Sequence, residues 1–464
     1  MKFPIGDYVG KRVFFVGIGG SSMSGLARML KWMGYDVAGS DQTRSHKVEA
    51  LEKDGIEVYV GHNGDNVKGS DLVVYSAAIS LKNPERKYAL DNNIPQIERC
   101  DLIGALMERC FPESVCISGT HGKTTTTAMM AETFITCGED PSVHIGGELD
   151  FLGGSTRLGK GDAFIVESCE FNRSFLQFLP TVAVILNIDE DHLDCYKDID
   201  DIENTFCEFA SLVPENGLTV GCGDEKRVRS VLEKLKCKTR TYGLEPHNEI
   251  RAENISYDEN GCAAYTATLF GHPLCEVELT VPGVHNVKNS LAVIAVASYF
   301  QLPMQRCAEA LHEFKGAHRR FELTSVTDGV KVYQDYAHNP VETMNALAVA
   351  RFQAKKRLWA VLQPHTYSRT KALFNDWLTC FGDADIVLVT DICGAREVDP
   401  GDINSSMLVE AMKKKGIKAH LTPTFDDAEK YLREHWEKDD VVVTLGCGNI
   451  DLLNEQIAEH GDTK

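Results

Sequence analysis

Short apolar runs, polar loops and amphipathic stretches alternate along most of the chain. The runs at residues 13–16, 72–75 and 163–166 consist of Val, Ile, Leu, Phe, Tyr and Ala, and each is followed directly by Gly, Ser or Glu. Stretches with helical spacing of apolar residues lie between such runs. This alternation is typical of parallel strands joined by crossover helices, so the predicted fold class is α/β.

The order of these patterns predicts three domains. The first, residues 1–110, closes in a helix around 98–110; the second is residues 111–315 and the third residues 316–464. A chain of 464 residues is also too long for one compact core. Further strands are expected at residues 114–118, 182–188, 330–333, 358–362, 386–390 and 441–445.

One stretch departs from this alternation. Residues 218–280 lack clear helix repeats and contain the turn signals Asn260-Gly261 and Gly271-His272. Short strands with such turns are typical of hairpins. We therefore predict a small antiparallel extension of the second domain's sheet over 218–280.

Composition narrows the classes of partner. The net charge is −20, which disfavours nucleic acid as a partner, and a polyanionic ligand would need local cations, backbone N–H groups or metal ions. No apolar run approaches the ~18 residues of a membrane helix. The 15 cysteines include no C-x-x-C pair. These features favour a cytoplasmic protein with reduced thiols and no membrane partner.

A Gly-rich loop follows the predicted strand 114–118 and precedes a helical pattern. Its glycines allow backbone N–H groups to surround phosphate oxygens, Lys123 can reach the β- and γ-phosphates, and the Thr124 hydroxyl can bind Mg²⁺. Ile117 stands where the generic motif has its first Gly, so this is a variant of that motif. The candidate ATP-binding residues here are Gly119, Thr120, His121, Gly122, Lys123, Thr124 and Thr125.

Acidic residues end the two neighbouring strands of the same predicted sheet. Glu167 follows the strand at 163–166, and residues 189–194, including His192, follow the strand at 182–188. The carboxyl ends of parallel strands meet at one sheet edge, and Mg²⁺ prefers oxygen ligands. We therefore expect the carboxylates of Glu167 and residues 189–194 to meet near bound ATP, where a carboxylate and the phosphates would hold Mg²⁺ and His192 would be an unusual extra ligand.

The first predicted strand is followed by Gly17-Ile18-Gly19, which alone suggests a dinucleotide site. Ser22 stands where the third Gly or Ala of that fingerprint would be, and Asp41 ends the next strand. The pyrophosphate could belong to a nicotinamide dinucleotide or to a UDP-linked molecule, since both would accept the same backbone N–H groups.

Six motifs together resemble the Mur ligases, the ATP-dependent amide-forming ligases of peptidoglycan precursor synthesis. They are the loop 119–124, Glu167, Asp191-His192, His285-Asn286 with Asn289, residues 318–322 and residues 335–338. The loop at 17–25 and the segment 363–370 are most similar to the branch of that family that adds L-alanine. The resemblance covers essentially the whole chain.

The resemblance implies a Rossmann-like domain for a UDP-sugar, a central ATPase domain and a Rossmann-like C-terminal domain. It implies joining of L-alanine to the lactyl carboxylate of UDP-N-acetylmuramate through an acyl phosphate, with ATP and Mg²⁺. Asn286 and Asn289 would contact adenine, Arg320 the γ-phosphate and Asp335 the ribose. Thr124 would hold one Mg²⁺ and Glu167 with His192 a second, while Lys123, His192, Arg320 and His338 would be catalytic. The implied UDP-sugar residues are Gly17, Gly19, Gly20, Ser22, Met23, Ser24, Asp41 and Ser76.

The amino acid site implied by the resemblance comprises Tyr336, His338, His365 and Arg369. Two positions depart from the family pattern: Asn339 replaces a second His, and Thr366 replaces an Arg found in some relatives. The alternatives are a recycling ligase that attaches a murein peptide, a nicotinamide-dependent oxidoreductase, and a nucleotide-binding regulator without catalysis. A monomer and a homodimer are both compatible with the sequence.

Overall fold

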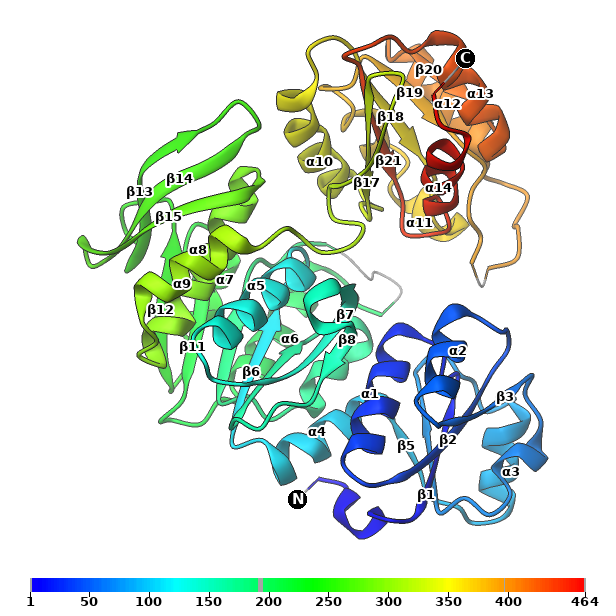
Figure 1. The fold of residues 1–464 in the computed structure, drawn as a ribbon, viewed down its shortest axis with the longest axis vertical. Coiled ribbons are helices and arrows are strands. Elements are labelled where there is room, and N and C mark those ends of the chain that lie inside the picture. Colours follow the sequence, from blue (N-terminus) through cyan, green and yellow to red (C-terminus); the bar gives the residue numbers. More distant parts are fainter. Residues whose placement is uncertain (1, 191–194, 396, 463–464) are drawn as a thin grey trace. The chain divides into compact units, whose positions relative to one another are not determined.

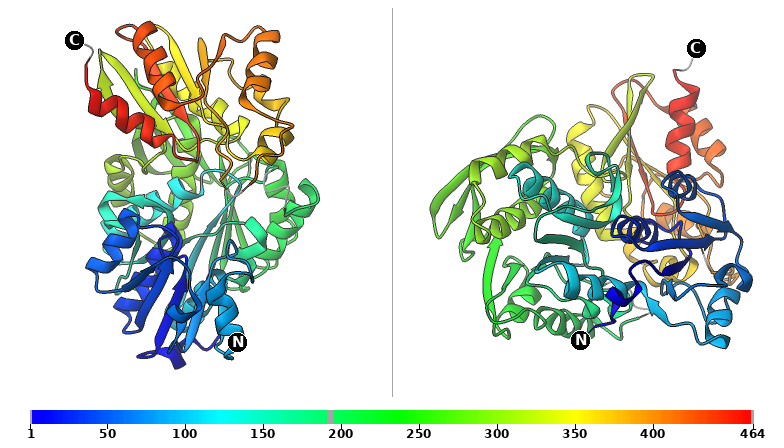
Figure 2. Two further views of the ribbon diagram at one scale, coloured as in Figure 1. Left: turned by 90° about the vertical axis from the view of Figure 1, so that its right-hand side faces the viewer. Right: turned by 60° about the horizontal axis from the view of Figure 1, so that its bottom comes forward.

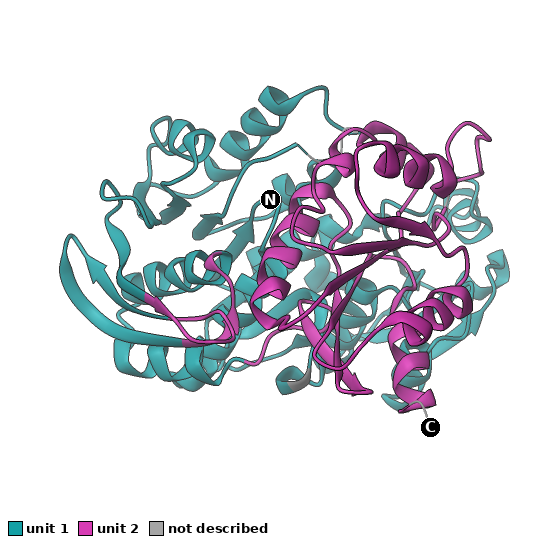
Figure 3. Ribbon diagram, turned by 90° about the horizontal axis from the view of Figure 1, so that it is seen from above, with its two compact units in different colours: residues 1–255, 264–278, 285–314 teal, residues 256–263, 279–284, 315–464 magenta. Residues whose placement is uncertain are grey.

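Three β-sheets follow one another along the chain, and helices flank each of them (Figure 1). The computed structural model describes residues 2–190, 195–395 and 397–462. The chain divides into two compact units (Figure 3): unit 1 comprises 1–255, 264–278 and 285–314, and unit 2 comprises 256–263, 279–284 and 315–464. The predicted α/β class is confirmed, whereas the three domain boundaries stay predictions.

The first sheet has five parallel strands in the order β3-β2-β1-β4-β5. They are β1 (Arg12–Val16), β2 (Asp36–Asp41), β3 (Glu57–Val60), β4 (Leu72–Tyr75) and β5 (Gln96–Glu98). Its helices are α1 (Ser21–Trp32), α2 (His46–Lys53), α3 (Pro84–Asp91) and α4 (Arg99–Cys110), with short 3-10 turns at Ile5–Tyr8 and Gly64–Val67. Since β1 lies between β2 and β4, the loop after β1 leaves the sheet where strand order reverses, the usual ligand position in such sheets.

The apolar run of β1 is buried on both faces. Val13 and Phe15 belong to one hydrophobic cluster, and Phe14 and Val16 belong to another. A strand covered on both faces shows a continuous apolar run rather than alternation, which is why the sequence identified it.

The second sheet has ten strands in the order β15-β14-β13-β12-β11-β10-β6-β9-β7-β8. They are β6 (Glu113–Ser118), β7 (Ser142–Leu149), β8 (Gly154–Arg157), β9 (Ala163–Glu167), β10 (Val182–Ile185), β11 (Leu218–Cys222), β12 (Lys238–Gly243), β13 (Ile250–Tyr257), β14 (Cys262–Leu269) and β15 (His272–Pro282). Its helices are α5 (Lys123–Thr136), α6 (Ile199–Ala210), α7 (Lys226–Leu232), α8 (Val284–Tyr299) and α9 (Met304–Glu313), with 3-10 turns at Asp150–Leu152 and Phe171–Gln177. Strand β6 runs parallel to β10 and β9, with Ser118 opposite Ile185 and Ile117 opposite Glu167. The ends of these three strands therefore lie at one edge.

The prediction for residues 218–280 is wrong in its first part. Strands β11 and β12 are parallel and joined by helix α7, so they continue the βαβ pattern. The helix has seven residues, and its buried Val228, Val231 and Leu232 give too short a repeat to stand out in the sequence. Within residues 218–280, only β13, β14 and β15 are neighbouring strands joined by short turns, which requires them to run antiparallel.

The third sheet has the order β16-β17-β21-β18-β19-β20. Its strands are β16 (Glu322–Thr327), β17 (Val330–Asp335), β18 (Leu358–Leu362), β19 (Ile386–Val389), β20 (Ala419–Leu421) and β21 (Val441–Leu445). Its helices are α10 (Pro340–Gln353), α11 (Tyr367–Ala372), α12 (Ser405–Lys414), α13 (Phe425–His435) and α14 (Asp451–His460), with a 3-10 turn at Asp376–Leu378. Strand β16 is antiparallel to β17 and was not predicted, because its residues are mostly half-buried and polar. Helices α10 and α12 pack on one face of this sheet and α13 and α14 on the other (Figure 2).

Helix α1 of the first sheet packs directly on strands β7 and β8 of the second, within unit 1. A Cβ at Gly25 would lie 2.0 Å from the Thr156 hydroxyl oxygen, so only glycine allows this approach. The two sheets also share one hydrophobic cluster that contains residues of both, such as Phe15 and Phe164. This packing joins the first two sheets into one compact unit.

No helix within residues 2–190, 195–395 and 397–462 has the length and apolar character needed to cross a bilayer.

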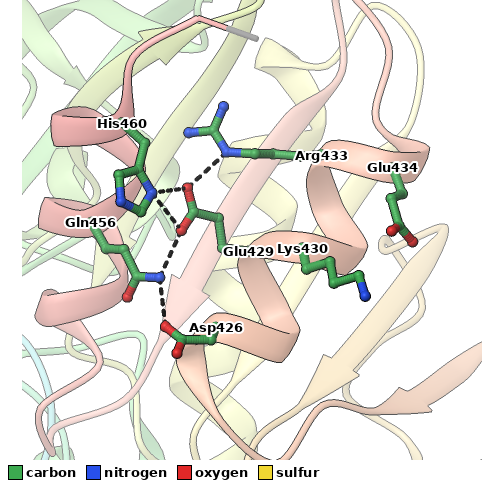
Figure 4. A pocket seen from close by; sticks show the side chains of 7 residues that line it. All are labelled: Asp426, Glu429, Lys430, Arg433, Glu434, Gln456 and His460. Atoms are coloured by element: carbon green, nitrogen blue, oxygen red, sulfur yellow. Dashed lines mark hydrogen bonds and ion pairs between the residues drawn. The ribbon is translucent and has the colours of Figure 1, made fainter.

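A buried carboxylate links the last two helices of unit 2. Glu429 on α13 accepts hydrogen bonds from Arg433 Nε (2.7 Å), His460 Nδ1 (2.9 Å) and Gln456 Nε2 (2.7 Å) (Figure 4). These side chains line a surface pocket together with Asp426, Lys430 and Glu434. Burial by itself would raise the pKa of Glu429, but the three hydrogen bonds outweigh it and hold that pKa below its ordinary value.

We predict that Glu429→Gln lowers the stability of unit 2 by about 1–3 kcal/mol at pH 7, because Arg433 loses a charged acceptor. A lowered carboxyl pKa stabilises the fold above the unfolded-state pKa, and this contribution disappears as the pH falls through the folded-state value. The difference between variant and native protein should therefore shrink below about pH 4. Thermal unfolding as a function of pH measures this, with Glu434→Gln, an exposed carboxylate on the same helix, as the control. An equal loss in both variants would contradict the assignment.

Candidate active site

The predicted phosphate loop connects the end of β6 to the start of α5. Gly119 has φ +144°, and a Cβ there would lie 2.9 Å from the Leu186 Cβ. Gly122 has φ +82°, and a Cβ there would lie 3.0 Å from Asn289 Oδ1. Both positions combine a left-handed backbone with a close neighbour, which restricts them to glycine. The strand, turn and helix occur in the predicted order.

The loop is held against the segment that follows β10. The Asn187 side chain accepts from His121 N at 2.8 Å and donates to His121 O at 3.1 Å. Asp189 N donates to the Thr120 hydroxyl at 2.9 Å. Hydrogen bonding to His121 lowers the pKa of Asp189. Strand β10 ends at Ile185 rather than at the predicted residue 188, because residues 187–189 bind the phosphate loop instead of continuing the strand.

Lys123 is the first residue of α5, and its ammonium turns back onto the loop. It donates to Gly119 O and Thr120 O, and it pairs with the Glu170 carboxylate at 2.9 and 3.2 Å. Burial alone would lower the pKa of Lys123, but the charge and hydrogen bond of Glu170, together with the charges of Cys169 and Glu167, outweigh burial and raise it. Lys123 is therefore a fixed cation at physiological pH.

Sequence reasoning missed Glu170, whose side chain is only 3% exposed. It lies three residues after Glu167, at the same sheet edge as the phosphate loop. Its position could have pointed to it, because β9 lies next to the strand that leads into the phosphate loop, and an acidic residue just after β9 can pair with Lys123.

Thr124 and Glu167 meet as the sequence predicted. The Thr124 hydroxyl donates to Glu167 Oε2 at 3.0 Å, and Gly146 N donates to the same oxygen at 2.9 Å. Two oxygen side chains beside the phosphate loop match the chemistry of Mg²⁺, which needs few protein ligands when phosphates and water complete its shell. No cluster of three His, Cys, Asp or Glu is present among the described residues, and His192 lies outside them.

Helix α8 brings the two predicted adenine residues to the same loop. Asn289 Oδ1 lies beside Gly122, and Asn289 Nδ2 donates to Asn286 Oδ1 at 3.1 Å. Both side chains are buried. Thr125 lies half-buried in the first turn of α5. The candidate ATP residues of unit 1 that the structure describes are therefore gathered around one loop.

The loop after β1 has a defined conformation. Gly17 has φ +77°, and Gly19 N donates to Asp41 Oδ2 at 2.9 Å, so Asp41 faces the loop. Ser76 follows β4, whose Tyr75 pairs with Val16, which brings Ser76 to the same edge. The Met23 side chain is buried in the core, which leaves only its backbone to meet a ligand. Gly20 and Ser24 flank the start of α1.

Cations and a buried histidine surround the first residues of α1. Lys47 Nζ donates to the Ser21 hydroxyl at 2.6 Å, and Arg99 donates to the Ser22 hydroxyl at 2.9 Å. His144 Nε2 lies 2.7 Å from the Ser22 hydroxyl. Burial, and secondarily the charge of Arg99, lowers the pKa of His144 to about 3, so its imidazole is neutral. These three side chains come from distant segments and carried no local signal in the sequence.

The remaining candidates lie in unit 2. Asp335 accepts from Phe321 N and Ala337 N, both at 2.8 Å, and burial raises the pKa of Asp335 to about 6 despite the charge of Arg320. The Arg320 guanidinium lies 5.0 Å from the Tyr336 ring centre. His338 Nδ1 lies 3.0 Å from Tyr336 O. The segment 318–338 thus brings Arg320, Asp335, Tyr336 and His338 into one cluster.

His365 and Arg369 flank the start of α11. Burial, followed by the charges of Arg369 and His338, lowers the pKa of His365 to about 4. His365 is therefore neutral near pH 7, and Arg369 is the cation of this pair.

Both departures from the family pattern are helix caps. Asn339 caps α10, its side chain accepting from Glu342 N at 2.9 Å, and Thr366 caps α11 by accepting from Arg369 N at 3.4 Å. Thr366 does so with φ +61°, a strained conformation for a β-branched residue. Local backbone geometry therefore accounts for these two residues.

Comparison with protein families gives three consecutive matches. Residues 12–110 match the Mur ligase family catalytic domain, residues 117–297 the Mur ligase middle domain, and residues 319–448 the Mur ligase glutamate ligase domain.

Individual relatives match over nearly the whole chain. UDP-N-acetylmuramate--L-alanine ligase of Acetivibrio thermocellus is 44% identical over 96% of this chain and 95% of the relative. The enzyme of the same name from Caldanaerobacter subterraneus subsp. tengcongensis is 43% identical, over 97% of both chains.

Solved structures show the same fold. UDP-N-acetylmuramate-alanine ligase from Thermotoga maritima superimposes with a TM-score of 0.83 at 28% identity, over 97% of this chain and 99% of that one. A murein peptide ligase from Psychrobacter arcticus gives 0.72 at 23% identity, over 97% and 98%. With 44% identity to its relative from Acetivibrio thermocellus and three family matches in order, the chain belongs to the Mur ligase family.

Proposed function

We propose that this chain joins L-alanine to the lactyl carboxylate of UDP-N-acetylmuramate, with ATP converted to ADP and phosphate. The observation that carries the proposal is the phosphate loop with Lys123, Thr124 and Glu167 in contact at one sheet edge. The substrates are proposed from the relatives of that name, which match over almost the entire chain.

Amide formation from a carboxylate requires a better leaving group than oxide. A carboxylate oxygen attacks the γ-phosphorus of ATP, the bond to ADP breaks, and an acyl phosphate forms. The L-alanine amine then attacks the acyl carbon, loses a proton and displaces phosphate. Since the reacting groups are anionic, the residues act mainly by positioning and by offsetting charge.

In unit 1, Lys123 would bind the terminal phosphates, and the backbone N–H groups of the loop would surround them. Thr124 and Glu167, with His192, would hold Mg²⁺, which when bound offsets the charge of the phosphates. Asn286 and Asn289 would contact the adenine beside Gly122. The loop at residues 17–24, with Asp41 and Ser76, would bind the UDP-sugar, where Lys47 and Arg99 add positive charge near a pyrophosphate.

In unit 2, Arg320 would contact the γ-phosphate and Asp335 the ribose. Arg369 is suited to hold the L-alanine carboxylate, because it is charged at neutral pH while His365 is not. Tyr336 and His338 complete the proposed amino acid site. His338 lies with Nδ1 against Tyr336 O and would accept the amine proton at its other ring nitrogen.

Of the three predicted domains, the first would bind the UDP-sugar, the second would bind ATP, and the third would close over the nucleotide. We further propose a cytoplasmic monomer or homodimer that acts on small molecules, without a nucleic acid or membrane partner. Membership of a ligase family leaves the nicotinamide-dependent oxidoreductase and the non-catalytic regulator without support.

The first prediction from this function concerns the substrates. Phosphate release from Mg²⁺ and ATP in the presence of UDP-N-acetylmuramate should be stimulated by L-alanine above the other amino acids, with a product heavier by one alanyl residue. Phosphate detection and product mass measure this in parallel. Stimulation by a murein tripeptide and by no single amino acid would instead identify a recycling ligase.

The second prediction concerns the phosphate loop. Lys123→Ala should reduce kcat by about a thousandfold or more, because the transferring phosphoryl group loses its fixed cation. Circular dichroism would check that the variant is folded, and Lys160→Ala, at an exposed lysine of the same unit, is the control. Ligation by folded Lys123→Ala at a rate near that of the native protein would contradict the role of Lys123 in phosphate binding.

The third prediction concerns the metal. Glu167→Gln should raise the Mg²⁺ concentration for half-maximal activity about tenfold, because an amide binds the ion more weakly than a carboxylate. A Mg²⁺ titration at saturating ATP measures this, with Glu139→Gln, exposed after α5, as the control. An unchanged titration curve would remove Glu167 from the proposed site.

A further inference from the structure

The ammonium of Lys123 already has protein acceptors for its three N–H groups. Two are carbonyl oxygens of the phosphate loop, Gly119 O and Thr120 O, and the third is the Glu170 carboxylate at 2.9 Å. Lys123 can therefore bind phosphates only if it gives up at least one of these bonds.

Glu170 is the anionic one of these acceptors, and it is deeply buried. Its side chain is 3% exposed and that of Lys123 is 12% exposed, so water screens their attraction poorly. The charge of Glu167 also raises the pKa of Lys123, but the hydrogen bonds of Glu167 are made with Thr124 and Gly146. The two glutamates of this edge thus have separate partners.

The backbone that carries Glu170 is held in place. Glu170 O accepts from Arg173 N at 2.8 Å and from the Tyr196 hydroxyl. Asn172 and Arg173 both have left-handed φ values, +52° and +53°, which persist only where the surroundings enforce them. The Arg173 guanidinium is in turn bound to Asp201 of α6 at 2.6 Å. Of the two partners, Lys123 has the longer and more flexible side chain and is the one able to move.

The triphosphate of ATP is a second anion for the same ammonium. We propose that Glu170 is a built-in counter-anion that competes with the ATP phosphates for Lys123, so that nucleotide binding requires the ammonium to leave Glu170. ATP affinity is then the difference between two ion pairs rather than the strength of one. Glu170 acts through Lys123, as a positioning residue, and the inference rests on the proposed ATP-dependent function.

The test is the affinity for a non-hydrolysable ATP analogue with Mg²⁺, measured by calorimetry without UDP-sugar or amino acid. Glu170→Gln should bind the analogue about tenfold more tightly than the native protein, because the competing charge is gone. Glu170→Asp should be about threefold tighter, since a shorter carboxylate holds the ammonium less closely. Glu429→Gln, which removes an equally buried, paired carboxylate in unit 2, should leave the affinity unchanged.

Unchanged or weaker binding in Glu170→Gln would overturn the inference, because it would make Glu170 a purely structural residue or an aid to phosphate binding. Thermal unfolding checks the fold of each variant, and Glu170→Asp carries the test alone if Glu170→Gln does not fold. A native protein that does not bind the analogue would count against the proposed function. Equal binding by native protein and variants would overturn only the role of Glu170.

A double-mutant cycle separates competition from simple repulsion between Glu170 and the phosphates. In a Lys123→Met background the tightening caused by Glu170→Gln should vanish, because the contested ammonium is absent. Tightening that persists in that background would show direct repulsion and would overturn the competition.

Discussion

The contact between the phosphate loop and the segment that follows strand β10 is the constraint on which the ATP site depends. Gly119 passes so close to Leu186 that any side chain would clash, and its φ of +144° is open to glycine alone. Because the loop packs against this segment, Asn187 and Asp189 can bind the backbone and side chains of residues 120 and 121. The parallel register of β6 and β9 then places Glu167 beside Thr124.

Charge sets a second constraint, because the protein must bind polyanions while carrying a net charge of −20. The structure meets it locally, with a buried Lys123 in the phosphate loop and with Lys47 and Arg99 at the start of α1. Each cation is held by protein groups, so its position is set before a ligand arrives. For Lys123 this arrangement also works against ligand binding, because Glu170, which holds the ammonium in place, is itself an anion.

Several residues in the candidate sites are determined by the backbone rather than by a ligand. Asn339 and Thr366 are the N-caps of α10 and α11, where a short polar side chain accepts hydrogen bonds from N–H groups of the first turn. His144 is neutral and bridges Ser22 and Thr156 between the packed α1 and β8. A comparison with the family motif assigns such positions to substrate recognition, although each of them first stabilises the local backbone or the packing of neighbouring elements.

The sequence by itself determined the fold class, the buried parallel strands with long apolar runs and the order of strand, Gly-rich loop and helix around Lys123, because these depend on local patterns. Buried parallel strands such as β1 are continuous apolar runs, and the loop needs Gly, Lys and Thr at fixed spacing. It failed at β16 and α7, whose patterns are too polar or too short. Only the tertiary structure brought Glu170 to Lys123, Asn187 to His121, and Arg99 and His144 to Ser22. These partners lie between 47 and 122 residues apart, and such pairings follow from strand order and helix packing, which no local pattern encodes.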